Sequence, residues 1–242
     1  MGSEYPYLYR NSYGEAARLN EKKRHWVSFR ENVSCARAIE LAIRFNDPDE
    51  KLNPDSVKSV LEKYGFKRVN FVLANTLNEM GCEWLISDEA RQWGKRIYVP
   101  KDGEHNRYYM VDTAAAFLEQ FIQQTREAYQ ALGLFGEEHL ATEELDYSGK
   151  VLILSPDSLK ESCWTPQNQL WYAYSGFGCS PTATGRAVYA VCLGDGEDVR
   201  WNRSDFTGVL DEQYLPDWAK DKLLELRGSQ QEPTSGPGMT MT

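Results

Sequence analysis

Five cysteines and three histidines are the side chains of this 242-residue chain best suited to nucleophilic chemistry. A nucleophilic cysteine needs a base, usually a histidine, within hydrogen-bond reach. Cys179 and Cys192 lie in the second half of the chain, whereas His25, His105 and His139 precede them by at least forty positions. We therefore interpret Cys179 as a small loop residue and Cys192 as a core-facing strand residue. We predict no catalytic residue and no enzymatic activity.

The spacing of the cysteines and histidines does not indicate a metal site either. Structural zinc sites use closely spaced pairs of ligands such as Cys-x2-Cys. Twelve residues separate even the nearest two cysteines, and the histidines are equally scattered. The carboxylates around Asp195 lie on or beside a tight turn, where Asp and Gly are expected for conformational reasons. We predict no metal ion and no cofactor.

Glycines between positions 174 and 203 raise the question of a phosphate-binding loop. The segment is YSGFGCSPTATGRAVYAVCLGDGEDVRWNR. A P-loop requires four residues between its glycines and then Lys, but Gly178 and Gly185 are further apart and Arg186 follows. A dinucleotide-binding loop opens a helix, whereas these glycines lead into an apolar alternation typical of a strand. We interpret Gly176 and Gly178 as positions that need a positive φ or a close approach of another backbone segment.

Charge is distributed unevenly along the chain, whose net charge is −9. Residues 1–140 carry 19 basic and 21 acidic residues, whereas residues 141–242 carry 8 and 15. The second half should therefore repel nucleic acid and favour a basic partner, although negative charge also serves solubility. The residues predicted to form an acidic partner-binding face are Asp195, Glu197, Asp198, Asp205, Asp211 and Glu212. Candidate aromatic anchors are Tyr5, Tyr7, Tyr9 and Trp201, and the alternative is that the tyrosines hold the first helix to the fold.

The hydrophobic periodicity changes near position 147 from that of helices to that of strands. Before it, the pattern predicts helices over 12–25, 28–45, 55–64, 67–80 and 112–132, with a small hairpin of strands 96–99 and 107–111. After it, we predict strands over 150–155, 169–175, 186–193 and 198–203 and a closing helix from Pro216. The caps expected are Ser12, Asn53 and Asp112.

These elements predict an α+β fold with a mainly helical domain (1–140) and an antiparallel β domain (147–227). The second domain is expected to be a small sheet or partly open barrel, closed by a C-terminal helix. Residues 228–242 are rich in Gly, Ser and Pro and are expected to form a disordered tail. The chain shows no signal peptide and no apolar run long enough to span a membrane, so we expect a cytoplasmic protein without membrane contacts.

Two helices over 55–80 have the length of a helix-turn-helix and provide an alternative interpretation. Lys67, Arg68, Asn70 and Asn75 could contact phosphates and base edges. Because the pair has nearly balanced charge, we favour an ordinary packed helical hairpin. Direct DNA binding therefore stays the second functional hypothesis.

Several stretches resemble an uncharacterised family from gut Firmicutes, often encoded on integrative and conjugative elements. They are YPYLYRNSYGEAARLNE, ENVSCARAIELAIR, LNPDSVKSVLEKYGFKRVNFVLANTL and SDEARQWGKRI, within residues 5–135. The segment GFGCSPTATGRAVYAVCLGDGEDVRWNRSDFTGVLDEQYLPDWAKDKL is similar to a C-terminal module of other proteins of such elements. The resemblance implies an accessory protein of mobile DNA and supplies no catalytic residues.

Residues and resemblance together lead us to expect a non-enzymatic, macromolecule-binding accessory protein. Its expected partner is a host or element-encoded protein, including one that handles nucleic acids. Counter-defence of the anti-CRISPR or anti-restriction kind, through the acidic surface, is the most specific form of this hypothesis.

Overall fold

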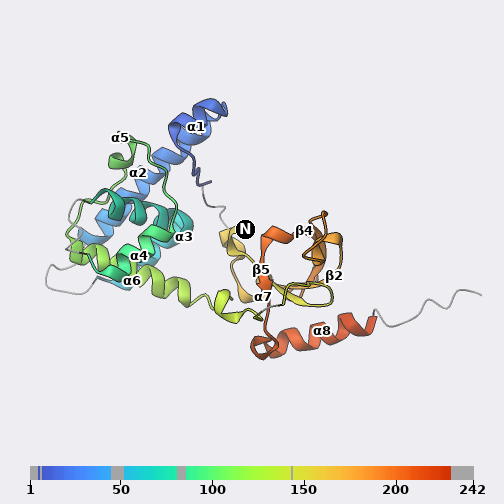
Figure 1. Cartoon of the computed structure of the whole chain (residues 1–242). Coiled ribbons are helices and arrows are strands. Elements are labelled where there is room, and N and C mark those ends of the chain that lie inside the picture. Colours follow the sequence, from blue (N-terminus) through green and yellow to red (C-terminus); the bar gives the residue numbers. More distant parts are fainter. Residues whose placement is uncertain (1–4, 6, 45–51, 81–85, 143, 230–242) are drawn as a thin grey trace, which may run out of the picture. The chain divides into compact units, whose positions relative to one another are not determined.

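A computed structural model describes residues 5, 7–44, 52–80, 86–142 and 144–229. The first half of the chain is helical, five antiparallel strands follow, and a helix comes last (Figure 1). The predicted α+β class is therefore confirmed. The chain divides into two compact units, Met1–Leu132 and Gly133–Thr242, so residues 133–140 group with the strands rather than with the helices. No helix within the described ranges combines the length and apolar composition that crossing a bilayer requires.

The described residues of the N-terminal unit form six α-helices. They are α1 (Tyr13–Arg18), α2 (Lys22–Arg44), α3 (Pro54–Glu79), α4 (Asp88–Arg96), α5 (Glu104–Tyr108) and α6 (Ala115–Gln130). Ser12 caps α1 as predicted, in a reciprocal arrangement with Glu15. The break between the first two helices lies at Asn20, whose left-handed conformation (φ 58°) interrupts the helical backbone, and not between residues 25 and 28 as predicted. Residues 22–25 therefore belong to α2, together with most of the predicted helix 28–45.

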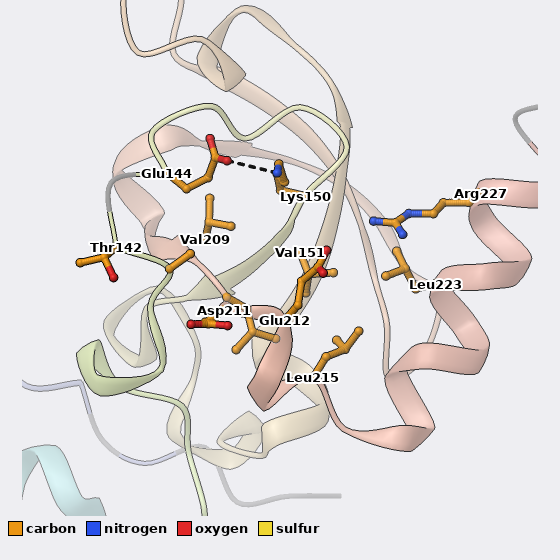
Figure 2. Close-up of a pocket in the computed structure, with 12 residues that line it drawn as sticks. Thr142, Glu144, Lys150, Val151, Val209, Asp211, Glu212, Leu215, Leu223 and Arg227 are labelled. Carbon is orange, nitrogen blue, oxygen red and sulfur yellow. Dashed lines mark ion pairs between the residues drawn. The ribbon is translucent and has the colours of Figure 1, made fainter.

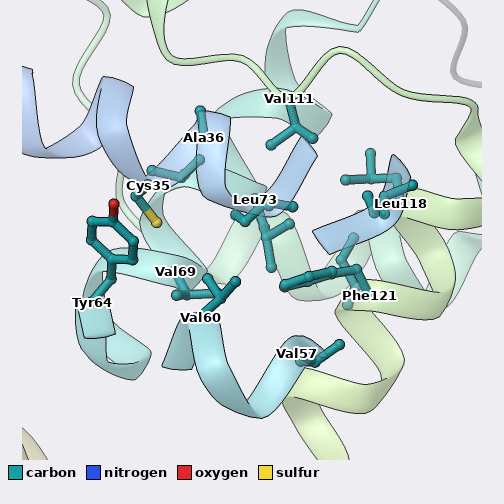
Figure 3. Packing of buried hydrophobic residues seen from close by; sticks show 14 of the residues in the cluster. Cys35, Ala36, Val57, Val60, Tyr64, Val69, Leu73, Val111, Leu118 and Phe121 are labelled. Atoms are coloured by element: carbon teal, nitrogen blue, oxygen red, sulfur yellow. The ribbon is translucent and has the colours of Figure 1, made fainter. Parts of the chain in front are cut away.

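The long helix α3 forms the centre of this unit. Asn53 caps it and Pro54 occupies its first position, as the sequence predicts. Gly65 (φ 76°, ψ 160°) produces a kink between its two segments, which correspond to the predicted helices 55–64 and 67–80. Figure 3 shows the apolar side chains of this helix packed with those of α2 and α6, among them Cys35, Leu73 and Phe121.

The hairpin predicted over 96–99 and 107–111 is wrong, because α4 ends at Arg96 and α5 covers Glu104–Tyr108. The buried side chain of Asn106 explains the difference. Its Oδ1 accepts a hydrogen bond from the amide of Asp102, and its Nδ2 donates to the carbonyl of Pro100. Both backbone groups are thereby satisfied without a strand partner.

Asp112 also differs from its predicted role as a helix cap. The helix α6 begins three positions later, with Ala114 as its N-cap residue. The amide of Asp112 donates instead to Oε1 of the buried Glu40 on α2. The helix α6 ends at Gln130, two residues before the predicted end at 132, and Gly133 follows with a positive φ of 64°.

The strands described in the C-terminal unit form a five-stranded antiparallel sheet in the order β4-β3-β2-β1-β5. Its strands are β1 (Val151–Leu154), β2 (Leu170–Ser175), β3 (Ala187–Cys192), β4 (Asp198–Asn202) and β5 (Phe206–Val209). The sheet is open, and the single 3-10 turn Arg203–Asp205 joins its two edge strands. The sequence did not predict β5, a four-residue strand that contains Gly208.

The two faces of the sheet bury different apolar clusters. One face packs Leu152, Trp171 and Val188 with the half-buried Trp201. The other packs Val151, Ile153 and Tyr172 against Ala219 and Leu223 of α8 (Asp217–Ser229), which is the predicted closing helix. Apart from Gly228 and Ser229, which end α8, the predicted disordered tail lies outside the described residues.

Candidate functional site

A pocket of about 360 Å³ lies beside β1, β5 and α8 in the C-terminal unit (Figure 2). Val151, Val209, Leu215 and Leu223 provide its apolar lining. Its charged and polar lining residues are Thr142, Glu144, Lys150, Asp211, Glu212 and Arg227. A volume of this size and a mixed lining are typical of sites that hold a small ligand or one side chain of a partner.

The two cations of the pocket already have acceptors within the unit. Nζ of Lys150 lies 3.1 Å from Oε2 of Glu144, the ion pair dashed in Figure 2. The guanidinium of Arg227 projects from α8 and lies 3.5 Å from the carbonyl oxygen of Gly149. Glu144 and Lys150 therefore largely neutralise each other, whereas a neutral carbonyl leaves the positive charge of Arg227 in place. Two carboxylates and this one guanidinium remain, so the lining keeps an excess of negative charge.

Asp211 and Glu212 are those remaining carboxylates, and they follow β5 directly. Asp211 caps the short 3-10 turn Glu212–Tyr214 by accepting hydrogen bonds from the amide and the side-chain amide of Gln213. These neutral donors leave its negative charge in place. Glu212 is exposed, and the described residues include no cation paired with it.

Three of the other predicted acidic residues lie at the β3–β4 turn, and the fourth, Asp205, directly precedes β5. Asp195, Glu197 and Asp198 are exposed at the β3–β4 turn, and the amide of Glu197 lowers the pKa of the Asp195 carboxyl by donating to it. Asp205 accepts a hydrogen bond from the amide of Asn202 and so caps the turn before β5. In the strand order, β2 and β1 separate the β3–β4 hairpin from β5, the strand that precedes Asp211.

The glycine-rich segment has the backbone role that the sequence predicts. Gly176 has a φ of 117°, and a Cβ there would lie 2.3 Å from the carbonyl oxygen of Ala187. At Gly178 a Cβ would lie 2.4 Å from the carbonyl oxygen of Arg186. The guanidinium of Arg203 also binds this segment, because it donates hydrogen bonds to the carbonyls of Gly178 and Cys179.

Neither cysteine of this segment has the surroundings of a nucleophile. The thiol of Cys179 donates to the carbonyl of Ser175, and that of Cys192 to the carbonyl of Gln167. Burial raises the pKa of both, in Cys192 to about 11. A thiol with a raised pKa stays protonated at neutral pH and reacts slowly.

The predicted aromatic anchors have several different environments. Tyr7 is 71% exposed, whereas Tyr9 is buried and donates to Oε2 of Glu21. Tyr5 is half-buried. Trp201 is not an exposed anchor, because its ring packs against Trp171 on one face of the sheet. The tyrosines thus serve partly to hold the N-terminal segment to the fold, which is the alternative that the sequence left open.

Two of the four predicted DNA-contacting residues are inaccessible. Arg68 is 1% exposed and donates to the carbonyls of Tyr7 and Ser28. Asn75 is fully buried and exchanges hydrogen bonds with Asn106. Lys67 and Asn70 are half-buried. Arg68 and Asn75 are therefore not available for contacts with DNA, because they point into the bundle from its central helix.

One constellation was missed because its members lie far apart in the sequence. Nε2 of His25 lies 2.9 Å, and Nδ1 of His105 3.8 Å, from Oδ2 of Asp102. The amide of Tyr13 donates to the same carboxylate. Within the described ranges, no group of His, Cys, Asp and Glu could hold a metal ion. The cluster joins α1, α2 and α5, and no sequence spacing indicates it.

Comparison with known proteins gives one match. No curated protein and no solved structure is significantly similar to the chain. The family model described as "Protein of unknown function (DUF3849)" matches residues 8–130, which is just over half of the chain and most of the N-terminal unit. The chain therefore belongs to the DUF3849 family.

Proposed function

We propose that the chain is a non-enzymatic binding protein whose C-terminal unit docks a basic segment of a partner protein. One observation carries this proposal: the pocket beside α8 combines an apolar lining with two carboxylates, Asp211 and Glu212, that form no ion pair among the described residues. A lysine or arginine side chain has the matching chemistry. Its methylene stem would pack on Leu215 and Leu223, and its charged end would reach Asp211 and Glu212.

The setting proposed for this docking comes from the sequence resemblance. The chain would be an accessory protein of a mobile element of gut Firmicutes, acting in the cytoplasm. Its partner would be a host or element-encoded protein, and a protein that handles nucleic acids has the basic surface that the pocket requires. Occupying that surface would be a means of counter-defence against a CRISPR or restriction system.

The test measures binding of a fluorescent oligo-arginine peptide to the full chain by anisotropy. Binding should weaken about tenfold in Asp211→Asn/Glu212→Gln, because the variant removes two charges that a bound cation would contact. Asn retains the side-chain oxygen that caps the turn, so the variant should fold normally.

Glu197→Gln is the matched control, since it removes an exposed carboxylate that does not line the pocket. If the control weakened peptide binding equally, the peptide would be attracted diffusely to an acidic surface, and the proposed binding in the pocket would be contradicted. Tighter binding of an oligo-glutamate peptide would indicate that Lys150 and Arg227 select an anionic partner instead, which also contradicts the proposal.

A further inference from the structure

Exposed aromatic rings and unneutralised cations share one surface of the N-terminal unit. Trp26 on α2 is 40% exposed and Tyr108 on α5 is 59% exposed. Between them lie Phe29 and His105, with ring centroids 5.3 and 5.4 Å from that of Trp26, and Phe29 is 6.1 Å from Tyr108. We call Trp26, Phe29, His105 and Tyr108 the aromatic platform.

The platform lies on a rigid base. His25 is buried, Asp102 is largely buried, and the two form the 2.9 Å contact described above. The His25 ring also contacts Trp26 edge-on, and it stacks on Phe29 with an angle of 16° between the planes. Exposing aromatic rings to water normally costs free energy. Rings held in place by such contacts are preorganised to stack on a flat ligand.

Cations accompany the platform along α2. Lys22, Lys23 and Arg30 are exposed, and their spacing of three or four residues from Trp26 places them on its side of the helix. Nζ of Lys22 lies 5.7 Å from the centroid of the Tyr13 ring. Residues 22–30 contain no carboxylate. Glu21, which precedes them, already binds Arg24 at 2.6 Å and Tyr9 at 3.0 Å.

No carboxylate among the described residues pairs with Lys23 or Arg30. Asp102 is held under the platform by His25 and the amide of Tyr13. On α5, Glu104 is exposed next to His105, and Arg107 lies on the same helix with the opposite charge. The surface around the platform therefore favours an anion.

We propose that this surface binds single-stranded nucleic acid. Rings beside cations match a ligand that carries flat bases and phosphates at regular intervals, since bases stack on aromatic side chains while Lys and Arg neutralise the backbone. A duplex hides its base faces and would meet only the cations. This site differs from the DNA-binding prediction made from 55–80, because it uses α2 and α5 and none of the four residues named there.

The test measures anisotropy of a fluorescent oligothymidylate of about 20 nucleotides against the full chain, near 50 mM salt. Binding is expected, and raising the salt should weaken it because phosphate contacts release counterions. Tyr108→Ala should weaken binding about tenfold by removing one stacking surface. Lys23→Ala/Arg30→Ala should weaken it and reduce the salt dependence.

Two matched variants serve as controls. Tyr98→Ala removes a tyrosine that is 65% exposed and outside the platform, and Lys58→Ala removes an exposed cation of α3 paired with Glu62. Both should bind like the original chain. Thermal unfolding of every variant shows whether it is folded, and Tyr108→Phe, which keeps the ring, should restore binding.

Three results would overturn the proposal. The first is that oligothymidylate does not bind at low salt. The second is that the platform variants and their controls lose affinity for oligothymidylate equally. The third is that a duplex binds as tightly as the single strand and that Tyr108→Ala has no effect on binding. The last result would indicate attraction by cations alone.

Discussion

Nε2 of His25 lies 2.9 Å from Oδ2 of Asp102, although 77 positions separate the two residues in the chain. The same carboxylate accepts hydrogen bonds of 3.0 Å from the amide of Tyr13, which begins α1. One largely buried side chain thus connects the start of α1, the first turns of α2 and the loop before α5. The platform residues Trp26 and His105 both lie against this connection.

The first prediction concerns this shared carboxylate. Asp102→Ala should lower the free energy of unfolding by about 2 kcal/mol, because it leaves the His25 imidazole and the Tyr13 amide without their acceptor. Urea unfolding measures the loss. Asp102→Asn retains one acceptor oxygen and should cost less than the alanine variant. A cost of Asp102→Ala no larger than that of a typical surface substitution would show that the contact has no structural importance.

The sequence predicts the elements that depend on local chemistry. Asn53 and Pro54 begin α3 and Gly65 interrupts it, because capping, a fixed φ and a positive φ are properties of single residues. Four strands were likewise predicted from their alternation, within a few residues of their ends. The acidic pair after β5 was named among the candidate residues, although its pocket was not.

Tertiary contacts explain what the sequence could not predict. Asn106 satisfies the backbone of the segment from Pro100 to Asp102, and this turned an expected hairpin into a loop and a short helix. Arg68, expected on a DNA-facing surface, is buried because carbonyls from distant segments accept its hydrogen bonds. The His25–Asp102 contact has no local periodicity at all, so only the folded chain reveals it.

The second prediction tests the backbone role of the glycine-rich turn. Gly176→Ala should destabilise the C-terminal unit by about 3 kcal/mol, because it combines a left-handed φ with a Cβ placed against the carbonyl of Ala187. Gly149→Ala is the matched control, since Gly149 has a φ of 69° but nothing within 4 Å of its Cβ position. The control should cost about 1 kcal/mol. Equal costs in thermal unfolding would contradict the close approach at Gly176.

The third prediction concerns the buried guanidinium of Arg68. Arg68→Met should cost about 3 kcal/mol in urea unfolding, because the carbonyls of Tyr7 and Ser28 lose their donor. Lys58→Met removes an exposed cation of the same helix, whose ion pair with Glu62 spans 3.9 Å. That variant should change stability by less than about 0.5 kcal/mol. If the two variants were equally stable, Arg68 would be a surface residue, as the DNA-binding hypothesis required.

The last prediction concerns stability at alkaline pH. Burial raises the pKa of the Cys35 thiol from 9.0 to about 12, because the core between α2 and α3 disfavours the thiolate (Figure 3). The unfolded chain therefore loses this proton at a lower pH than the folded chain does. Below pH 9 the thiol is protonated in both the folded and the unfolded chain, so its contribution to the free energy of unfolding has its full value. Between pH 9 and 12 the free energy of unfolding falls by up to about 1.4 kcal/mol per pH unit.

Urea unfolding at a series of pH values from about 8 to about 10.5 measures this loss, and Cys35→Ala provides the comparison. The variant lacks the thiol, so its stability should be lower at pH 8 by about 1 kcal/mol but should decline less steeply above pH 9. Tyrosines and lysines titrate in the same range in both proteins, and the difference between the two slopes isolates Cys35. Parallel curves for the original chain and the variant would mean that the thiol ionises as readily in the folded protein as in the unfolded one.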